Sequence, residues 1–294
     1  MGQETFTLTL DQNGAEVEVV INDTSAPPPA GAVAFTTVGT SQWTVPGGIT
    51  SISAVAVGGG GGGFGYWDTD ANWLRTGTGG NGGDLSWGDL TVTPGETLDI
   101  TVGGAGQSDT SSGGAYGNLN NSSTAGGSSY ISRSGTVLLR GKGGNASGQS
   151  NGDTNIGDGG ATGGAGGYDG GKQYGGQGGG GAAGYSGDGT NGMPGGFSQY
   201  NAYFAETPSG GSASGGDGGG GQSSPGGGGG GVGIEGQGTS APKQSGRGGS
   251  DGNNASGATG GAYGGGGGGG RTSGDGAQGA VRIIWGGSTY PTPS

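Results

Sequence analysis

The stretch SISAVAVGGGGGG, residues 51–63, decides how the rest of the chain is organised. Its first part is an apolar run typical of a β-strand, and this run leads directly into six consecutive glycines. Further glycine tracts occur at residues 178–181, 218–221, 226–231 and 264–270. Glycine accounts for 91 of the 294 residues, so almost a third of the chain has no side chain and a conventional core cannot form in the glycine-rich stretches.

A glycine tract has two physical outcomes. Ordering the backbone costs about 1–2 kcal/mol per residue, so an isolated tract is a flexible linker. The alternative is a bundle of extended threefold helices of the polyglycine-II type, whose N–H and C=O groups are satisfied by neighbouring helices at close range. Collagen is excluded, because glycine does not recur at every third residue and only 11 prolines are present. A bundle needs a frame that holds the ends of its tracts.

The composition allows either order or disorder. The apolar fraction of 27% favours disorder. Five tryptophans, ten tyrosines and several strand patterns favour an ordered body, which is the prediction made here. The net charge of −12 and the lack of a basic cluster argue against nucleic-acid binding. A signal peptide is not expected, because the N-terminal residues have neither a basic n-region nor an apolar h-region. Membrane insertion is not expected, because no apolar run approaches the roughly 18 residues of a membrane span.

The chain divides into four parts. Residues 1–23 are predicted to form a β-hairpin for attachment or assembly, because apolar residues alternate on both sides of an Asn-Gly turn signal. Residues 24–32 are a Pro-rich linker, residues 33–287 form the glycine-rich body, and residues 288–294 are a tail. Within the body, strands are expected at residues 33–38, 41–45, 49–57, 90–102 (around a Pro94-Gly95 turn), 128–132, 136–140 and 280–285.

These strands predict an all-β fold with almost no α-helix. Residues 33–57 and 280–285 are expected to clamp a β-sandwich frame, from which an inserted bundle of polyglycine-II helices extends. Trp43, Trp87 and Trp285 are assigned to the core of the sandwich. Residues 64–75 show no strand period and are interpreted as a polar, aromatic insertion.

Residues suited to catalysis are scarce. The chain has no histidine, which excludes a Ser-His-Asp or Cys-His arrangement. The acidic residues could supply the carboxylate pair of a glycosidase, but no pattern marks such a pair. A near match to the calcium nonapeptide repeat at residues 79–87 lacks the apolar eighth residue and a tandem copy. The sequence therefore predicts a protein that is not an enzyme and has no cofactor or metal.

Two aromatic insertions are the candidate contact residues. One contains Tyr66, Trp67 and Trp73, and the other contains Phe197, Tyr200, Tyr203 and Phe204. Tyrosine and tryptophan are enriched at binding hot spots, which favours a recognition surface for carbohydrate or protein. These residues could equally cap the ends of the bundle, and both interpretations stay open. The isolated tyrosines, at positions 168, 174, 185 and 263, are assigned to capping or groove filling.

Three stretches of the body resemble a known family. The run GTSQWTVPGGITSISAVAVGGGGGG at residues 39–63, the stretch 90–106 and the run GAVRIIW at residues 279–285 are similar to the glycine-rich domains of tailed-bacteriophage fibre and adhesin proteins. The resemblance covers roughly residues 33–287. It implies a β-sandwich that carries polyglycine-II helices, with receptor-binding loops at the distal tip. Similar modules occur in ectodomains of anaplastic-lymphoma-kinase-type receptors, but this chain lacks their cysteines and secretion signal.

The resemblance implies a non-catalytic phage virion protein, namely a tail fibre or adhesin that recognises the host cell surface. Its expected partners are a receptor, either a polysaccharide or an outer-membrane protein, and other virion proteins bound through the N-terminal hairpin. A homotrimer is expected by analogy with fibres. The alternative is a structural decoration or fibre protein of the virion that serves as a spacer without receptor binding.

Overall fold

The fold is all-β. The computed structural model describes residues 5–9, 16–20, 29–68, 73–113, 121–168, 177–185, 187–192, 221–222, 224–226, 228–234, 259–270, 273–287 and 289–290. These residues contain sixteen strands, mostly in antiparallel pairs, and no helix. The predicted fold class is confirmed at this level.

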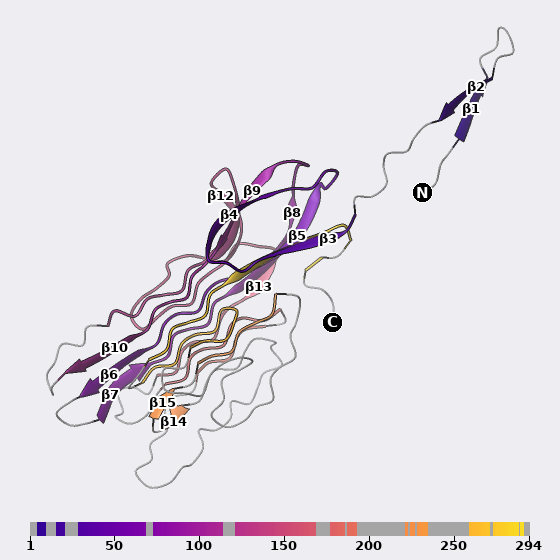
Figure 1. Ribbon diagram of the computed structural model, residues 1–294. Coiled ribbons are helices and arrows are strands. Elements are labelled where there is room, and N and C mark those ends of the chain that lie inside the picture. Colours follow the sequence, from indigo (N-terminus) through magenta and orange to yellow (C-terminus); the bar gives the residue numbers. More distant parts are fainter. Residues whose placement is uncertain are drawn as a thin grey trace.

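The N-terminal hairpin is present. Strands β1 (Thr5–Thr9) and β2 (Glu16–Val20) pair antiparallel, with Phe6 opposite Val19. Among the described strands these two pair only with each other. Figure 1 shows the hairpin standing apart from the sheets of the body. Its turn lies outside the described residues.

Two larger sheets form a sandwich-like frame. The four-stranded sheet has the order β12-β11-β9-β4, and the five-stranded sheet has the order β13-β8-β5-β16-β3. The first sheet contains β4 (Gly39–Thr44), β9 (Thr97–Val102), β11 (Ser129–Arg133) and β12 (Thr136–Gly141). The second contains β3 (Gly31–Phe35), β5 (Ser51–Val57), β8 (Leu85–Thr91), β13 (Gly159–Ala161) and β16 (Ala280–Trp285).

Strand β16 closes the frame. It lies between β5 and β3, so that Ile283 is opposite Ala54 on one side and Val33 on the other. The last strand of the body, β16, is therefore hydrogen-bonded between the early strands β3 and β5. This pairing confirms the predicted clamp between residues 33–57 and 280–285. Strands β8 and β9 do not pair with each other. The turn at Pro94-Gly95, where Gly95 has a φ of +81°, instead carries the chain from one sheet to the other.

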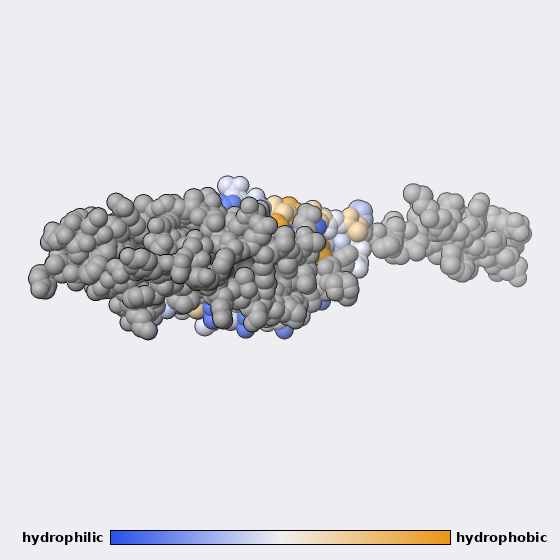
Figure 2. Space-filling view, turned by 90° about the horizontal axis from the view of Figure 1, so that it is seen from below, coloured by the Kyte–Doolittle hydropathy of each residue, from blue (hydrophilic) through white to orange (hydrophobic). Residues whose placement is uncertain are grey.

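Strand β5, in the middle of the five-stranded sheet, is buried on both faces. In β5, Ile52, Ala54 and Ala56 pack in the core between the two sheets. The alternate residues Val55 and Val57 point to a second cluster, because successive side chains of a strand face opposite sides. This second cluster is completed by residues from the glycine-rich part of the chain and its end: Ala182, Ala183, Val232, Ile234 and Tyr290. In the face shown in Figure 2, the described residues that are visible mix hydrophobic and hydrophilic types.

The assignment of the tryptophans needs one correction. Trp43 and Trp285 pack against the core between the sheets, with ring centroids 5.5 Å apart, as predicted. Trp87 packs against the second cluster instead. Position 87 has the parity of Leu85 in β8, and Leu85 faces away from the space between the sheets.

A three-stranded sheet replaces the predicted insertion at residues 64–75. Strands β6 (Phe64–Asp68) and β7 (Trp73–Thr78) pair antiparallel with a bulge between Tyr66 and Trp67, and β10 (Asp109–Gly113) pairs parallel to β6. Neither β7 nor β10, the outer strands of this sheet, has the apolar alternation that predicts a strand. Short strands also occur in the region expected to lack them: β13, and the pair β14 (Gly221–Gln222) and β15 (Ser224–Gly226).

Glycine-rich segments connect the frame to this three-stranded sheet. Segment 58–63 continues β5 and leads into β6, segment 79–84 returns from β7 to β8, and segment 103–108 runs from β9 to β10. Figure 1 shows these segments side by side, with β6, β7 and β10 at the end away from the frame. We call this the distal end of the segments. Further segments, 121–128, 142–145 and 273–279, adjoin β11, β12 and β16.

Segment 58–63 is hydrogen-bonded in a threefold order. Its backbone N–H groups donate to three other segments, at N···O distances of 2.8–3.1 Å, and the partners repeat every three residues: Gly58 and Gly61 donate to Asp84 and Asn81, Gly59 and Gly62 to Gly127 and Thr124, and Gly60 and Gly63 to Ala277 and Gly274. A Cβ added at any of these six glycines would lie 2.0–2.2 Å from a carbonyl oxygen of segment 103–108, 142–145 or 264–270. Six segments thus surround this one at backbone distance.

Candidate functional site

Tyr66 lies inside the distal end rather than on its surface. Its side chain is 2% exposed, and that of Phe64 on the same strand is 5% exposed. Two aromatic side chains are therefore packed where the glycine segments end. For Tyr66 this burial favours capping over the predicted receptor contact.

The backbone brings Trp67 and Trp73 together. Trp67 is opposite Leu74 in β7 and Ser112 in β10, and Trp73 is opposite Asp68. Both tryptophans thus sit on paired strands at the distal end, although the aromatic side chains themselves are outside the described part of the chain. The predicted residues Phe197, Tyr200, Tyr203 and Phe204 also lie outside the described residues.

Tyr168 is an exposed aromatic residue that the sequence did not single out for binding. Its side chain is 61% exposed, and its backbone forms a bridge to Thr78, the last residue of β7. This exposure does not fit groove filling, and capping stays a prediction for this tyrosine. Tyr185 and Tyr263 pack against the second cluster, whereas Tyr174 lies outside the described residues. Nothing in the local sequence distinguishes the exposed tyrosine from the packed ones.

Asparagine and aspartate side chains complete the hydrogen bonding of segment 162–167. The N–H groups of Gly163 and Gly166 donate to the side chains of Asp84 and Asn81, at 2.7 and 3.0 Å. Those of Thr162 and Ala165 donate to Asp188 and Asn191, both at 2.8 Å. In each pair the acceptors are three residues apart, which matches the threefold order of the backbone. This spacing was visible in the sequence and could have indicated the arrangement.

Among these side-chain acceptors, Asp84 has a shifted pKa. Burial raises the pKa of its carboxyl above the ordinary value, and the hydrogen bonds from the Gly163 N–H and the Asn155 amide act in the opposite direction. The Coulombic effect of Lys142 lowers this pKa, and that of Asp188 raises it. The raised pKa thus comes from the burial of a carboxyl group that serves as a hydrogen-bond acceptor between two segments.

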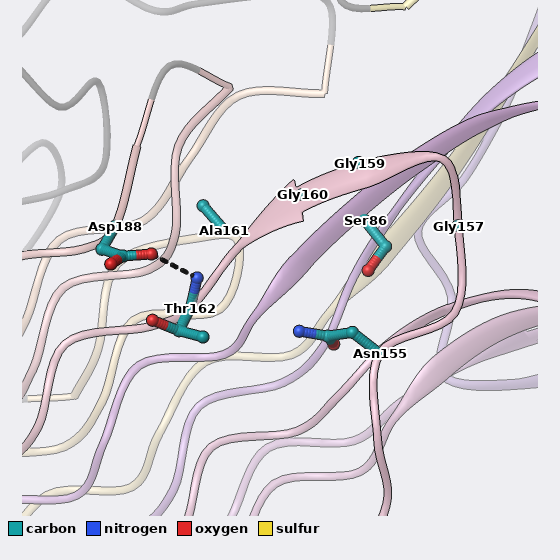
Figure 3. Close-up of a pocket in the computed structure, with 8 residues that line it drawn as sticks. All are labelled: Ser86, Asn155, Gly157, Gly159, Gly160, Ala161, Thr162 and Asp188. Atoms are coloured by element: carbon teal, nitrogen blue, oxygen red, sulfur yellow. Dashed lines mark hydrogen bonds between the residues drawn. The ribbon is translucent and has the colours of Figure 1, made fainter.

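A groove opens on the flank of the frame beside β13. It has a volume of about 250 Å³ and is lined by Ser86, Asn155, Gly157, Gly159, Gly160, Ala161, Thr162 and Asp188. Figure 3 shows the Ser86 and Asn155 side chains facing the same open space, with Asp188 at the other end of the groove. A second depression lies along residues 34–41 at the edge of the frame.

These arrangements offer hydrogen-bonding and aromatic contacts. Among the described residues, no group of three or more histidine, cysteine or acidic side chains lies together as metal ligands would. Within the same part of the chain, no helix is long and apolar enough to cross a membrane. No protein-family model and no curated protein matches the chain. Its function must therefore be argued from its own residues.

Proposed function

We propose that the glycine-rich segments form a bundle of polyglycine-II helices. A threefold extended helix turns its N–H group by a third of a circle at each residue, so its hydrogen-bond partners must repeat every three residues. The partners of residues 58–63 follow this order. The close approach of carbonyl oxygens on the Cβ side of all six glycines supports the same arrangement, because only glycine tolerates it.

We further propose that the chain is a virion protein of a tailed bacteriophage that recognises the host cell surface without catalysis. The observation that carries this proposal is the position of the three-stranded sheet, which bears Trp67 and Trp73 at the distal end. Exposed Tyr168 adjoins the same sheet. Rigid amphipathic aromatic residues at the end of a stiff support suit the binding of a polysaccharide or an outer-membrane protein.

In this proposal the N-terminal hairpin serves attachment to the particle, whereas the distal end serves recognition of the host. It stands apart from the body and carries an alternating apolar stripe, which a two-stranded hairpin must cover to be stable in water. We assign it to attachment to other virion proteins. A homotrimer remains the proposed assembly, and the subunit count from mass measurement in solution tests it.

The second candidate is a structural spacer of the virion. The burial of Tyr66 favours it, because at least one predicted contact residue serves the packing of the distal end. The two candidates differ in whether Trp67, Trp73 and Tyr168 affect adsorption.

An adsorption-interference experiment separates them. Purified full-length protein is added to host cells before the phage, and free phage are counted. Receptor binding predicts a saturable fall in adsorption that is lost in Trp67→Ala, Trp73→Ala or Tyr168→Ala. Val38→Ala is the matched control, since Val38 is 50% exposed but lies at the edge of the frame. Competition that all three distal variants retain would refute the proposed contact surface. A folded protein that does not compete at all would favour the spacer.

A further inference from the structure

The groove beside β13 is lined by a polar side chain of the frame. Ser86 is 1% exposed, and the part of it that is accessible faces this groove. Its neighbours Leu85 and Trp87 belong to the second cluster, so Ser86 points to the other side of β8. Figure 3 shows the Ser86 hydroxyl facing the groove, where it can donate a hydrogen bond to a ligand and accept one from it.

The other polar groups of the groove are held in fixed positions. The Oδ1 of Asn155 accepts from the Lys142 N–H at 2.9 Å, and its Nδ2 donates to Asp84 at 3.0 Å. The Oδ1 of Asp188 accepts from the Thr162 N–H at 2.8 Å. The second Nδ2 hydrogen of Asn155, the second carboxylate oxygen of Asp188 and the Thr162 hydroxyl are thus available to a ligand.

The wall between these groups is bare backbone at a fixed position. A Cβ at Gly159 would lie 2.2 Å from the Trp87 ring, and one at Gly160 would lie 2.3 Å from the Leu85 carbonyl oxygen. Strand β13 therefore rests directly on β8 and its tryptophan. The wall of the groove at these two positions is therefore backbone that is held against β8.

The chemistry of the lining selects the class of ligand. No lysine or arginine lines the groove, and Asp188 does, so phosphate, sulfate and carboxylate ligands are disfavoured. Two hydroxyls, a carboxamide and a carboxylate both donate and accept hydrogen bonds, as vicinal hydroxyl groups require. The volume of about 250 Å³ is below the roughly 300–1,000 Å³ of sites for drug-sized molecules, which suits a single ring.

We propose that this groove binds one neutral sugar ring, with the hydroxyls of Ser86 and Thr162 and the carboxylate of Asp188 as its hydrogen-bonding groups. The site is separate from the distal aromatic residues. It would give the protein a carbohydrate contact on the flank of the frame whether or not the distal end binds a receptor.

The test is ligand-observed saturation-transfer NMR on the full-length protein, with D-glucose, D-galactose and D-mannose as probes and D-glucuronate as the anionic comparison. At least one hexose should bind, and glucuronate should bind more weakly. Ser86→Ala and Asp188→Asn should each weaken hexose binding roughly two- to tenfold, as expected for one hydrogen bond. Ser51→Ala, the same change at an exposed site of β5, should leave binding unchanged.

Three results would overturn the proposal: no hexose binding by the folded protein, binding that both groove variants retain, or glucuronate bound as tightly as the hexoses. Asp188→Asn keeps an acceptor for the Thr162 N–H, so this variant remains informative should Ser86→Ala fail to fold. The assay involves neither cells nor phage. Its outcome is therefore independent of the adsorption experiment.

Discussion

Replacing one glycine inside the bundle by alanine is the most direct test of the close packing. In Gly60→Ala the new Cβ would lie 2.0 Å from the Gly265 carbonyl oxygen, whereas ordinary contacts begin near 3.4 Å. One segment must therefore move by more than an ångström. Such a shift breaks hydrogen bonds, since the Gly60 N–H donates to Ala277 at 2.8 Å and the Gly60 carbonyl accepts from Gly106 at 2.8 Å. The Ala277 N–H also donates to Gly265, at 2.8 Å.

The size of the effect follows from these bonds. Three hydrogen bonds contribute about 0.5–1.5 kcal/mol each. Alanine also restricts the unfolded chain, which offsets about 0.4–1 kcal/mol of the loss. Gly60→Ala should therefore lower the free energy of unfolding by about 1–4 kcal/mol.

Gly104→Ala is the matched control within the bundle. Its Cβ would meet only a methyl group of Val38, at 3.5 Å, so its stability should stay within about 1 kcal/mol of the original protein. Denaturant unfolding followed by tryptophan fluorescence measures both variants, with an unchanged slope as the sign of a comparable transition. Equal midpoints for the two variants would refute the packing. A Gly60→Ala protein more stable than the original would indicate that residues 58–63 are a flexible linker.

Three further predictions concern the side-chain acceptors Asp84 and Asn81 and the packing of segment 58–63. Burial raises the pKa of Asp84, so the charged carboxylate is disfavoured in the folded state. The denaturant midpoint of unfolding should therefore rise as the pH falls from neutral through this pKa. Asp84→Asn should remove the part of this pH dependence that comes from Asp84. Asn81→Ala removes the acceptor of the Gly166 N–H and should cost about 1–3 kcal/mol by denaturation, whereas Asn81→Asp, which keeps an acceptor, should cost less. By hydrogen exchange, the amides of residues 58–63 should be strongly protected, and rates equal to those of a free peptide would contradict the bundle.

The strands of the frame were predictable because their apolar side chains mark them in the sequence. Strand β5 and strand β16 are apolar, and both appear close to the expected bounds. Strands β6 and β7 were missed for the opposite reason. They pair because segments 58–63 and 79–84 deliver them side by side, which a local pattern does not encode.

The candidate sites were less predictable than the frame. Aromatic residues were recognised as candidates, but the exposure of Tyr168 and the burial of Tyr66 depend on tertiary packing that their neighbours in sequence do not reveal. The groove had no sequence signal at all. Its lining comes from β8, β13 and residues 155 and 188, and Ser86 stands in a stretch that reads only as an ordinary strand.

The order of the segments can be explained by the order of the strands. A glycine segment has no side chains with which to select a neighbour or a register, so the selection must come from the strand that it continues. Strands β8, β5 and β16 are adjacent in the five-stranded sheet. Their continuations keep this order, because the Gly58 N–H donates to Asp84 and the Gly60 N–H donates to Ala277.

The second sheet supplies the third direction of hydrogen bonding. The Gly59 N–H donates at 2.9 Å to Gly127, in the segment that leads into β11 of the four-stranded sheet. Two sheets packed face to face thus place their continuing segments on both sides of segment 58–63, which a single sheet cannot do. Glycine segments that have no side chains to specify their arrangement thus obtain it from the apolar core between the sheets. The apolar side chains of the frame therefore determine the positions of glycine residues that lie outside it.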